Sequence, residues 1–182
     1  FVTISVLADH EDELDKSLVI QNQTFSGDNI YIFDISIVFD NCFFMGTALQ
    51  SGTSHLKSLF RLKFQNCTWL FLDNYNLKQD YLAQLAYLSE INFKKCTVSL
   101  SNEDMHNFKG IVVKNTSKVA FEQCVFVFNG YVSNFMVAME IDILSISESL
   151  LIDKTVRSEY YNNASKTGEF QFGNGKIELM LF

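Results

Sequence analysis

The sequence of 182 residues contains no proline and only two arginines, Arg61 and Arg157. Codon bias in an AT-rich genome accounts for much of this composition, and the lack of proline also suits a sheet, because proline cannot donate to a sheet ladder. The 14 Lys and Arg are outnumbered by 21 Asp and Glu, which gives a formal net charge of −7. A nucleic-acid-binding protein needs a basic surface to neutralise phosphates, so we expect no nucleic-acid partner.

Long apolar runs are missing as well. No stretch reaches the roughly 18 consecutive apolar residues of a membrane-spanning helix, so we expect no membrane insertion within this segment. Hydrophobic residues nevertheless make up 48% of the chain, which is enough for a full core. This content excludes wholesale disorder.

What the sequence does contain is an internal repeat. Four segments share the pattern apolar-x-Phe-x-x-Cys, and all four cysteines of the chain occupy its last position, with spacings of 25, 29 and 28 residues. The copies are residues 37–44, 62–69, 91–98 and 119–126. Two weaker copies flank them at residues 18–25, where Gln23 takes the Cys position, and at residues 141–146.

Each copy alternates with period two and then shifts phase by one residue. A continuous strand would place Phe39 and Cys42 on opposite faces, although both fit an interior position. The two intervening residues, Asp40 and Asn41, therefore indicate a sharp corner between two strands, where Asn can adopt the left-handed conformation. A strand, a corner and a second strand that recur at this spacing predict one coil of a parallel β-solenoid.

Coils of such a solenoid stack about 4.8 Å apart, so that each copy aligns with its neighbour. We therefore predict one interior ladder of phenylalanines and one of cysteines. The members are Phe39, Phe64, Phe93 and Phe121 in the first ladder and Cys42, Cys67, Cys96 and Cys124 in the second.

The Phe-x-x-Cys copies resemble the repeats of right-handed parallel β-helix proteins of the pectin-lyase-like kind. They are most similar to the degenerate repeats of large cell-surface proteins of ciliates and other protists, and of bacterial polymorphic outer-membrane proteins. Those repeats often carry Phe-x-x-Asn followed by Gly-Gly-Ala-Ile, whereas this chain has Cys in place of Asn and lacks the second stretch. The resemblance covers residues 18–146 and implies an all-β, right-handed parallel β-helix of about six to seven coils.

Residues 1–182 are interpreted as a single β-solenoid segment. The chain opens as the strand-like Phe-Val-Thr-Ile-Ser-Val-Leu and stays apolar up to Phe182. Natural termini are usually polar and loosely ordered, so we expect the segment to belong to a longer chain.

Two structural alternatives stay open at this point. An antiparallel β-sandwich also consists of short alternating strands, although it does not need a phase-locked repeat. In the longest coil, Asn76 and Gln79 fit a capping box that would open a short helix over residues 77–88, with its leucines on one face. A long loop that packs these leucines on the solenoid fits equally well.

The four cysteines admit two interpretations. Side chains stacked in register point in parallel, and Cβ atoms about 4.8 Å apart exceed the usual 3.5–4.5 Å of a disulfide. We therefore expect a buried ladder of reduced thiols, with disulfides as the alternative. Zinc sites place ligand pairs two to four residues apart and no such pair exists, so we expect no metal and no other cofactor.

A polysaccharide lyase or hydrolase of the same fold is the catalytic alternative. Such an enzyme needs acids that gather on one exposed sheet, but Asp34, Asp40, Asp73, Asp104 and Asp142 do not recur at one phase of the repeat. The sequence therefore favours a protein that is not an enzyme.

Histidines and contiguous acids add no clear site. His10, His55 and His106 are isolated, and spacing supports no Ser/His/Asp or Cys/His set. The acidic run of residues 9–15 is typical of a solvated loop; weak calcium binding stays open, although the run lacks the Gly and the spacing of an EF-hand loop.

Four Asn-x-Ser/Thr sequons begin at Asn22, Asn66, Asn115 and Asn163. In a secreted protein each is a candidate for N-glycosylation, and the alternative is a set of ordinary surface or stacked amides. Among the aromatic residues outside the ladder, Phe43, Tyr131 and the pair at 160–161 are candidates for exposed platforms. We expect Trp69 in the core instead.

Together these features predict a structural or adhesive segment of an extracellular or cell-surface β-solenoid, such as part of a filament or coat. Its expected partners are other protein chains or sister copies of the same chain, with glycans as a further partner. The alternatives are a carbohydrate-active enzyme of β-helix fold and a viral or phage fibre module.

Overall fold

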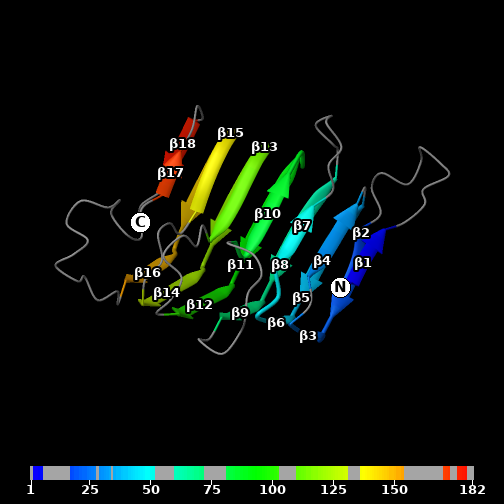
Figure 1. Cartoon of the computed structure of the whole chain (residues 1–182). Coiled ribbons are helices and arrows are strands. Elements are labelled where there is room, and N and C mark those ends of the chain that lie inside the picture. Colours follow the sequence, from blue (N-terminus) through cyan, green and yellow to red (C-terminus); the bar gives the residue numbers. More distant parts are fainter. Residues whose placement is uncertain are drawn as a thin grey trace.

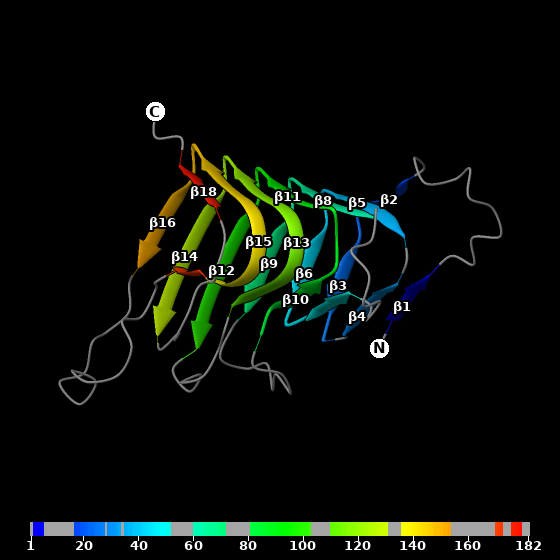
Figure 2. The ribbon, with the colours of Figure 1, turned by 90° about the horizontal axis from the view of Figure 1, so that it is seen from above.

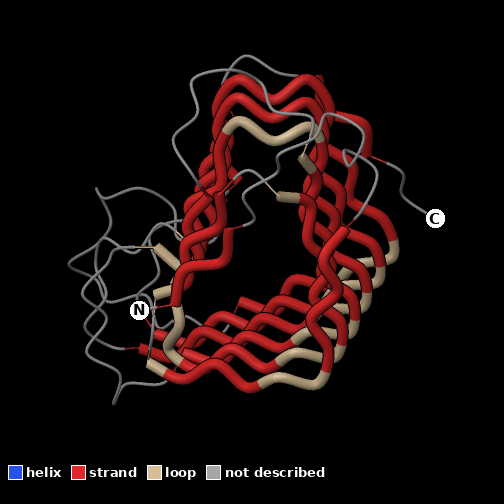
Figure 3. The backbone as a smooth tube through the Cα atoms, turned by 90° about the vertical axis from the view of Figure 1, so that its right-hand side faces the viewer, coloured by secondary structure: helices blue, strands red, loops and turns tan. Residues whose placement is uncertain are grey.

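The computed structural model describes residues 2–5, 17–27, 29–33, 35–51, 60–71, 81–102, 110–130, 136–153, 170–172 and 176–179. Within these ranges the chain consists of β-strands and connecting corners, without a helix. Seen end-on, it winds around three sides that enclose the core (Figure 3).

The strands fall into three sets, one for each side. The first side holds β1 (Val2–Ser5), β4 (Ile30–Phe33), β7 (Leu49–Ser51), β10 (Ala83–Ala86) and β17 (Phe170–Phe172). The second side holds β2 (Ser17–Gln21), β5 (Ser36–Asp40), β8 (Arg61–Gln65), β11 (Glu90–Lys94) and β18 (Lys176–Leu179). The third side consists of β3 (Thr24–Ser26), β6 (Phe43–Met45), β9 (Thr68–Phe71), β12 (Thr97–Asn102), β14 (Val125–Gly130) and β16 (Leu150–Asp153).

Two longer strands join the first side to the second. β13 (Ile111–Glu122) and β15 (Met136–Ser147) bend through the corner between these sides as continuous strands (Figure 2). The first two sides therefore belong to one 12-stranded sheet, while the third side is a separate six-stranded sheet.

All strand pairs among the described residues are parallel, and neighbours in each sheet come from successive passes of the chain (Figure 1). The register aligns Phe39 with Phe64, Phe64 with Phe93 and Phe93 with Phe121. The predicted parallel β-solenoid is confirmed. The antiparallel sandwich is wrong, because its neighbouring strands would run in opposite directions.

The number of coils needs a correction. Four windings, β1–β3, β4–β6, β7–β9 and β10–β12, are built from three separate strands each. The winding that follows has a different build, because β13 and β15 each merge two sides into one strand. The solenoid is thus not the uniform series of six to seven coils that the repeat predicted.

The helix expected over residues 77–88 is wrong in its described part. Residues 77–80 lie outside the described ranges, but Ala83–Ala86 form strand β10. Ala83 and Leu85 point into the core in the period-two alternation of a strand, and they align with Ile111 and Val113 of β13. Parallel pairing on both edges of β10 overrides the helical spacing of the leucines.

Aromatic rings fill the core in two neighbouring stacks. In the first stack the rings of Phe39, Phe64, Phe93 and Phe121 follow one another with centroids 4.9–5.3 Å apart and interplanar angles of 4–12°. All four side chains are at most 1% exposed. Face-to-face stacking is imposed here by the strand register, because equivalent residues on adjacent parallel strands share one direction.

A second stack runs along the third side, through Phe25, Phe44 and Trp69. Its rings meet those of the first stack edge-on: Phe39 and Phe44 lie 5.5 Å apart at 74°, and Phe64 and Trp69 lie 5.1 Å apart at 67°. Edge-to-face contacts of this kind add about 0.5–1.5 kcal/mol each beyond the buried area.

Trp69 lies in the core, as its inward phase predicted, while Phe43 points outward and is half-buried. The indole Nε1 of Trp69 is buried and has no hydrogen-bond partner among the described residues. An unpaired buried N–H costs about 1–3 kcal/mol, so the indole stays inside because of its ring contacts and not because of its polar atom. Tyr131 and residues 160–161 lie outside the described ranges.

Candidate functional site

The most regular feature of the solenoid is the corner between its second and third sides. At six successive corners one residue adopts a left-handed backbone conformation with φ between 47° and 55°. These residues are Asn22, Asn41, Asn66, Lys95, Gln123 and Glu148. Each immediately precedes the Cys position of the repeat, so the phase shift read from the sequence coincides with the left-handed residue.

Main-chain hydrogen bonds tie each corner to the next coil. The N–H of Asn41 donates to the carbonyl of Gln65 at 2.9 Å, and the N–H of Thr68 donates to the carbonyl of Cys42 at 3.0 Å. The same two bonds recur one coil further on, where Asn66 donates to Lys94 and Thr97 donates to Cys67. The corners are therefore hydrogen-bonded from coil to coil in the same register as the strands.

Inside the corner lies the thiol ladder, which we define as Cys42, Cys67, Cys96 and Cys124. All four cysteines are free thiols that are at most 2% exposed. Each sulfur lies within donating distance of two carbonyls, one on its own coil and one on the preceding coil. For Cys67 these are the carbonyl of Gln65 at 3.2 Å and that of Phe39 at 3.4 Å.

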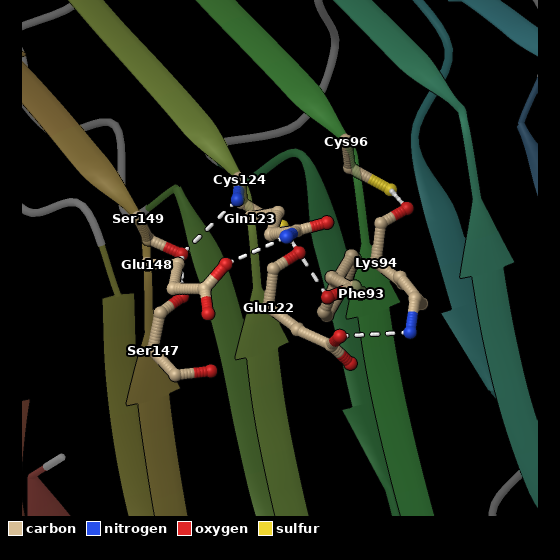
Figure 4. A network of polar contacts seen from close by, with 9 residues as sticks. All are labelled: Phe93, Lys94, Cys96, Glu122, Gln123, Cys124, Ser147, Glu148 and Ser149. Atoms are coloured by element: carbon tan, nitrogen blue, oxygen red, sulfur yellow. Dashed lines mark hydrogen bonds and ion pairs between the residues drawn. The ribbon is translucent and has the colours of Figure 1, made fainter. Parts of the chain in front are cut away.

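The bond within the coil gives the Cys position its local role. The side chain after the left-handed residue donates to the carbonyl of the residue before it, and thereby closes the corner. Cys124 and Ser149 do this side by side: Cys124 Sγ lies 3.4 Å from the carbonyl of Glu122, and Ser149 Oγ lies 2.9 Å from that of Ser147 (Figure 4).

Ser149 lies beyond the weak final copy that the sequence predicts at residues 141–146. Leu144 and Ile146 align with Val119 and Phe121, which puts Ser149 in the Cys position of a complete copy. The signal that could have found it is the run from Ile146 to Leu151, which keeps the apolar-x-x-small-x-apolar pattern with Ser in place of Cys.

A second series of left-handed residues lies at the corner between the first and second sides. Tyr87, Asn115 and Glu140 have φ values of 61°, 48° and 56°. Thr116 follows Asn115, is fully buried and donates to the carbonyl of Lys114 at 3.1 Å. The left-handed conformation thus recurs at this corner without a recurring residue type, so no sequence pattern predicts it.

Burial is the largest influence on the pKa of two of the thiols. It raises the pKa of Cys96 and of Cys42, because a thiolate is poorly solvated in the core. The pKa of Cys67 and that of Cys124 are lowered, because the neighbouring Cys96 would donate a hydrogen bond to the thiolate of either.

Outside the corner, polar side chains form a matching ladder. Asn41 donates to the side chain of Asn22 at 2.7 Å, and Asn66 donates to Asp40 at 3.1 Å. Further along, Lys94 forms a 2.7 Å ion pair with Glu122 (Figure 4). Exposed pairs of this kind contribute little to stability, about 0–1 kcal/mol each.

The four sequons are placed differently. Asn22 and Asn66 are exposed at the corner, whereas Asn115 is half-buried. The side-chain amide of Asn66 is already engaged with Asp40. Asn163 lies outside the described residues.

The acids and histidines considered for catalysis do not come together in the described part of the chain. Asp40 is held by Gln21 and Asn66, and Asp142 is exposed on β15. Outside the described ranges lie Asp34, Asp73, Asp104, His10, His55, His106 and the acidic run of residues 9–15.

Neither a metal-binding cluster nor a membrane-spanning helix is found among the described residues. Three or more His, Cys, Asp or Glu side chains nowhere gather there in a group that could hold a metal ion. The same residues contain no helix with the length and apolar character needed to cross a membrane.

Comparison with known proteins gives no assignment: no family model, no curated protein and no solved structure matches this chain. The class of protein is therefore defined by the fold alone, as a parallel β-solenoid.

The left-handed corner gives a test of local strain at Lys95. The left-handed conformation costs a residue other than Gly, Asn or Asp roughly 1–2 kcal/mol, and the exposed side chain of Lys95 has no partner among the described residues. We expect Lys95→Asn to raise the free energy of unfolding by about 0.5–1 kcal/mol and Lys95→Val to lower it by at least about 1 kcal/mol. Urea denaturation measures both.

Lys63→Asn is the matched control, because it removes the same charge from an exposed strand position of β8. It should change stability by less than about 0.5 kcal/mol. A Lys95→Asn variant that is as unstable as Lys95→Val would contradict the assigned corner.

Proposed function

We propose that this chain is a non-catalytic structural or adhesive segment of an extracellular or cell-surface β-solenoid, which assembles with sister copies. The proposal starts from the continuity of the fold. The third side is a ladder of six parallel strands, and the aromatic stack beside it joins four successive coils. Coils joined in this way form a stiff body in which each repeat contacts its neighbours, as in other solenoids.

The open N-terminal rung is the observation that carries the proposal. We define this rung as β2 and β3. Among the described strands, none pairs with the free edge of either one. Leu18 points inward like its partner Ile37, yet it is 39% exposed while Ile37 is fully buried. Among the described residues, no strand therefore covers Leu18 on this side.

The next side chains along the rung are only half-buried. They are Ile20 and Phe25, whose partners Phe39 and Phe44 are fully buried. Asn22 already has the left-handed conformation of the other corners. The rung thus has the same build as the buried coils.

A free strand edge beside exposed apolar side chains favours pairing with another chain. A further coil, from a sister copy or from the same chain, would satisfy the main-chain groups and cover Leu18 together. Because the two ends of a solenoid differ, stacking of this kind is head-to-tail and leads to open filaments and not to closed dimers.

Substitution at the open rung tests the assembly. The unmodified chain should associate with increasing concentration in sedimentation velocity. We expect Leu18→Lys to weaken this association at least tenfold, because it places a charge where the sister coil would pack, and tenfold corresponds to about 1.4 kcal/mol.

Val19→Lys is the matched control. This substitution adds the same charge to the same strand, but the side chain of Val19 points outward and is 53% exposed. Its effect should be clearly smaller. The assembly proposal would be contradicted if the chain stays monomeric at all concentrations. Equal effects of the two variants would contradict it as well.

The sequons support the extracellular assignment, and Asn22 offers the sharpest test of it. Its side chain is exposed, so a glycan at this position meets no neighbour in the core. When the chain is expressed through a eukaryotic secretory pathway, we expect Asn22→Gln to remove the mass of one glycan. Intact mass before and after enzymatic deglycosylation measures this.

Asn41→Gln is the control, because Asn41 has the same corner conformation but is not part of a sequon. It should leave the glycan mass unchanged. A secreted chain without a glycan at Asn22 would argue against the extracellular assignment.

A further inference from the structure

The corner bond alone does not explain why sulfur fills the same position four times. Hydroxyl groups close equivalent corners: Thr47 donates to the carbonyl of Met45, Thr116 to that of Lys114, and Ser149 to that of Ser147. Thr47 and Thr116 are fully buried, so burial does not demand a thiol either. The geometry and burial of the corner therefore do not explain why the thiol ladder consists of cysteines.

What the four cysteines add is a row of sulfurs that are equally spaced, one on each of four coils. Hydrogen bonds from Thr68, Thr97 and Val125 to the carbonyls of Cys42, Cys67 and Cys96 place the four cysteines on consecutive coils. Adjacent coils lie about 4.8 Å apart, and side chains in register point in parallel. Neighbouring sulfurs therefore lie side by side, about one coil spacing apart, which is too far for a disulfide.

The expected distance between sulfurs on adjacent coils matches the length of two collinear metal–sulfur bonds. A metal–thiolate bond measures about 2.3 Å, so two opposed bonds span about 4.6 Å. Hard and borderline cations need three or more ligands, and no group of that size exists among the described residues. Soft cations with a filled d shell prefer thiolates and are satisfied by two.

We propose that adjacent sulfurs of the thiol ladder form a binding site for a soft divalent cation such as Hg(II), which takes two thiolates in line. The four sulfurs provide two such sites, Cys42 with Cys67 and Cys96 with Cys124. Using the middle pair, Cys67 and Cys96, would leave both outer thiols without a neighbour.

Binding replaces two S–H bonds by two metal–sulfur bonds. With Hg(II), two thiols and one ion give one uncharged S–Hg–S unit, and two protons go to the solvent. An uncharged unit suits a buried position, where an isolated charge is strongly disfavoured. The thiols lose their hydrogen bonds to the corner carbonyls, and because binding releases protons, affinity rises with pH.

Two double variants with equal numbers of thiols test the proposal. Cys42→Ser with Cys67→Ser leaves the adjacent pair Cys96 and Cys124. Cys67→Ser with Cys124→Ser leaves Cys42 and Cys96, which are two coils apart. Ser149 occupies the same corner position in the natural chain, so serine is compatible with the fold there.

The probe is Hg(II) at equilibrium with an excess of glutathione, and native mass spectrometry counts the ions retained. A preorganised pair of cysteines binds the ion more tightly than two separate glutathione molecules do, because the second metal–sulfur bond forms within one molecule. We expect two ions on the unmodified chain, one on the adjacent-pair variant and none on the separated-pair variant. Equal retention by the two variants, or no retention by the adjacent pair, overturns the proposal.

A measurement on the unmodified chain covers the case in which a variant does not fold. Thiols are counted in denaturant after the ion has been bound and the excess removed. Two thiols protected per ion support the proposal, while one thiol per ion, as expected for independent sites, overturns it.

Discussion

The structure depends on one local constraint, the left-handed residue that turns the chain between the second and third sides. This residue shifts the alternation by one position, so that Phe39 before the corner and Cys42 after it both point inward. The small donor that follows closes the turn on the carbonyl before it. Because every coil turns at the same place, the strands align without a slip, and a slip of one residue would send each inward side chain outward.

Core packing follows from that alignment. Equal residues on adjacent parallel strands meet face to face, which produces the Phe39–Phe121 stack and, at the corner, the row of thiols. The same alignment keeps the thiols parallel and reduced. Polar side chains outside the corner, such as Lys94 and Glu122, pair across coils for the same geometric reason. One constraint thus orders the core, the thiols and the surface amides.

The sequence predicted the parts of the fold that repeat a residue type. The Phe-x-x-Cys repeat predicted the corner, the inward phase of Phe93 and the parallel winding. It did so because each corner needs a small hydrogen-bond donor after its turn, and this donor recurs in the sequence once per coil. It did not predict the corner at Tyr87, Asn115 and Glu140, where the backbone recurs and the residues do not. Nor did it predict strand β10, since the leucines there fit helical spacing and only pairing with β7 and β13 decides the outcome.

The most direct test of this account is to locate the sulfurs by anomalous diffraction from crystals of the unmodified chain. Stacked corners predict that the four cysteine sulfurs lie in one row, with successive members about 4.8 Å apart. Sulfurs scattered through the molecule, or strands of opposite direction on either side of them, would contradict the account.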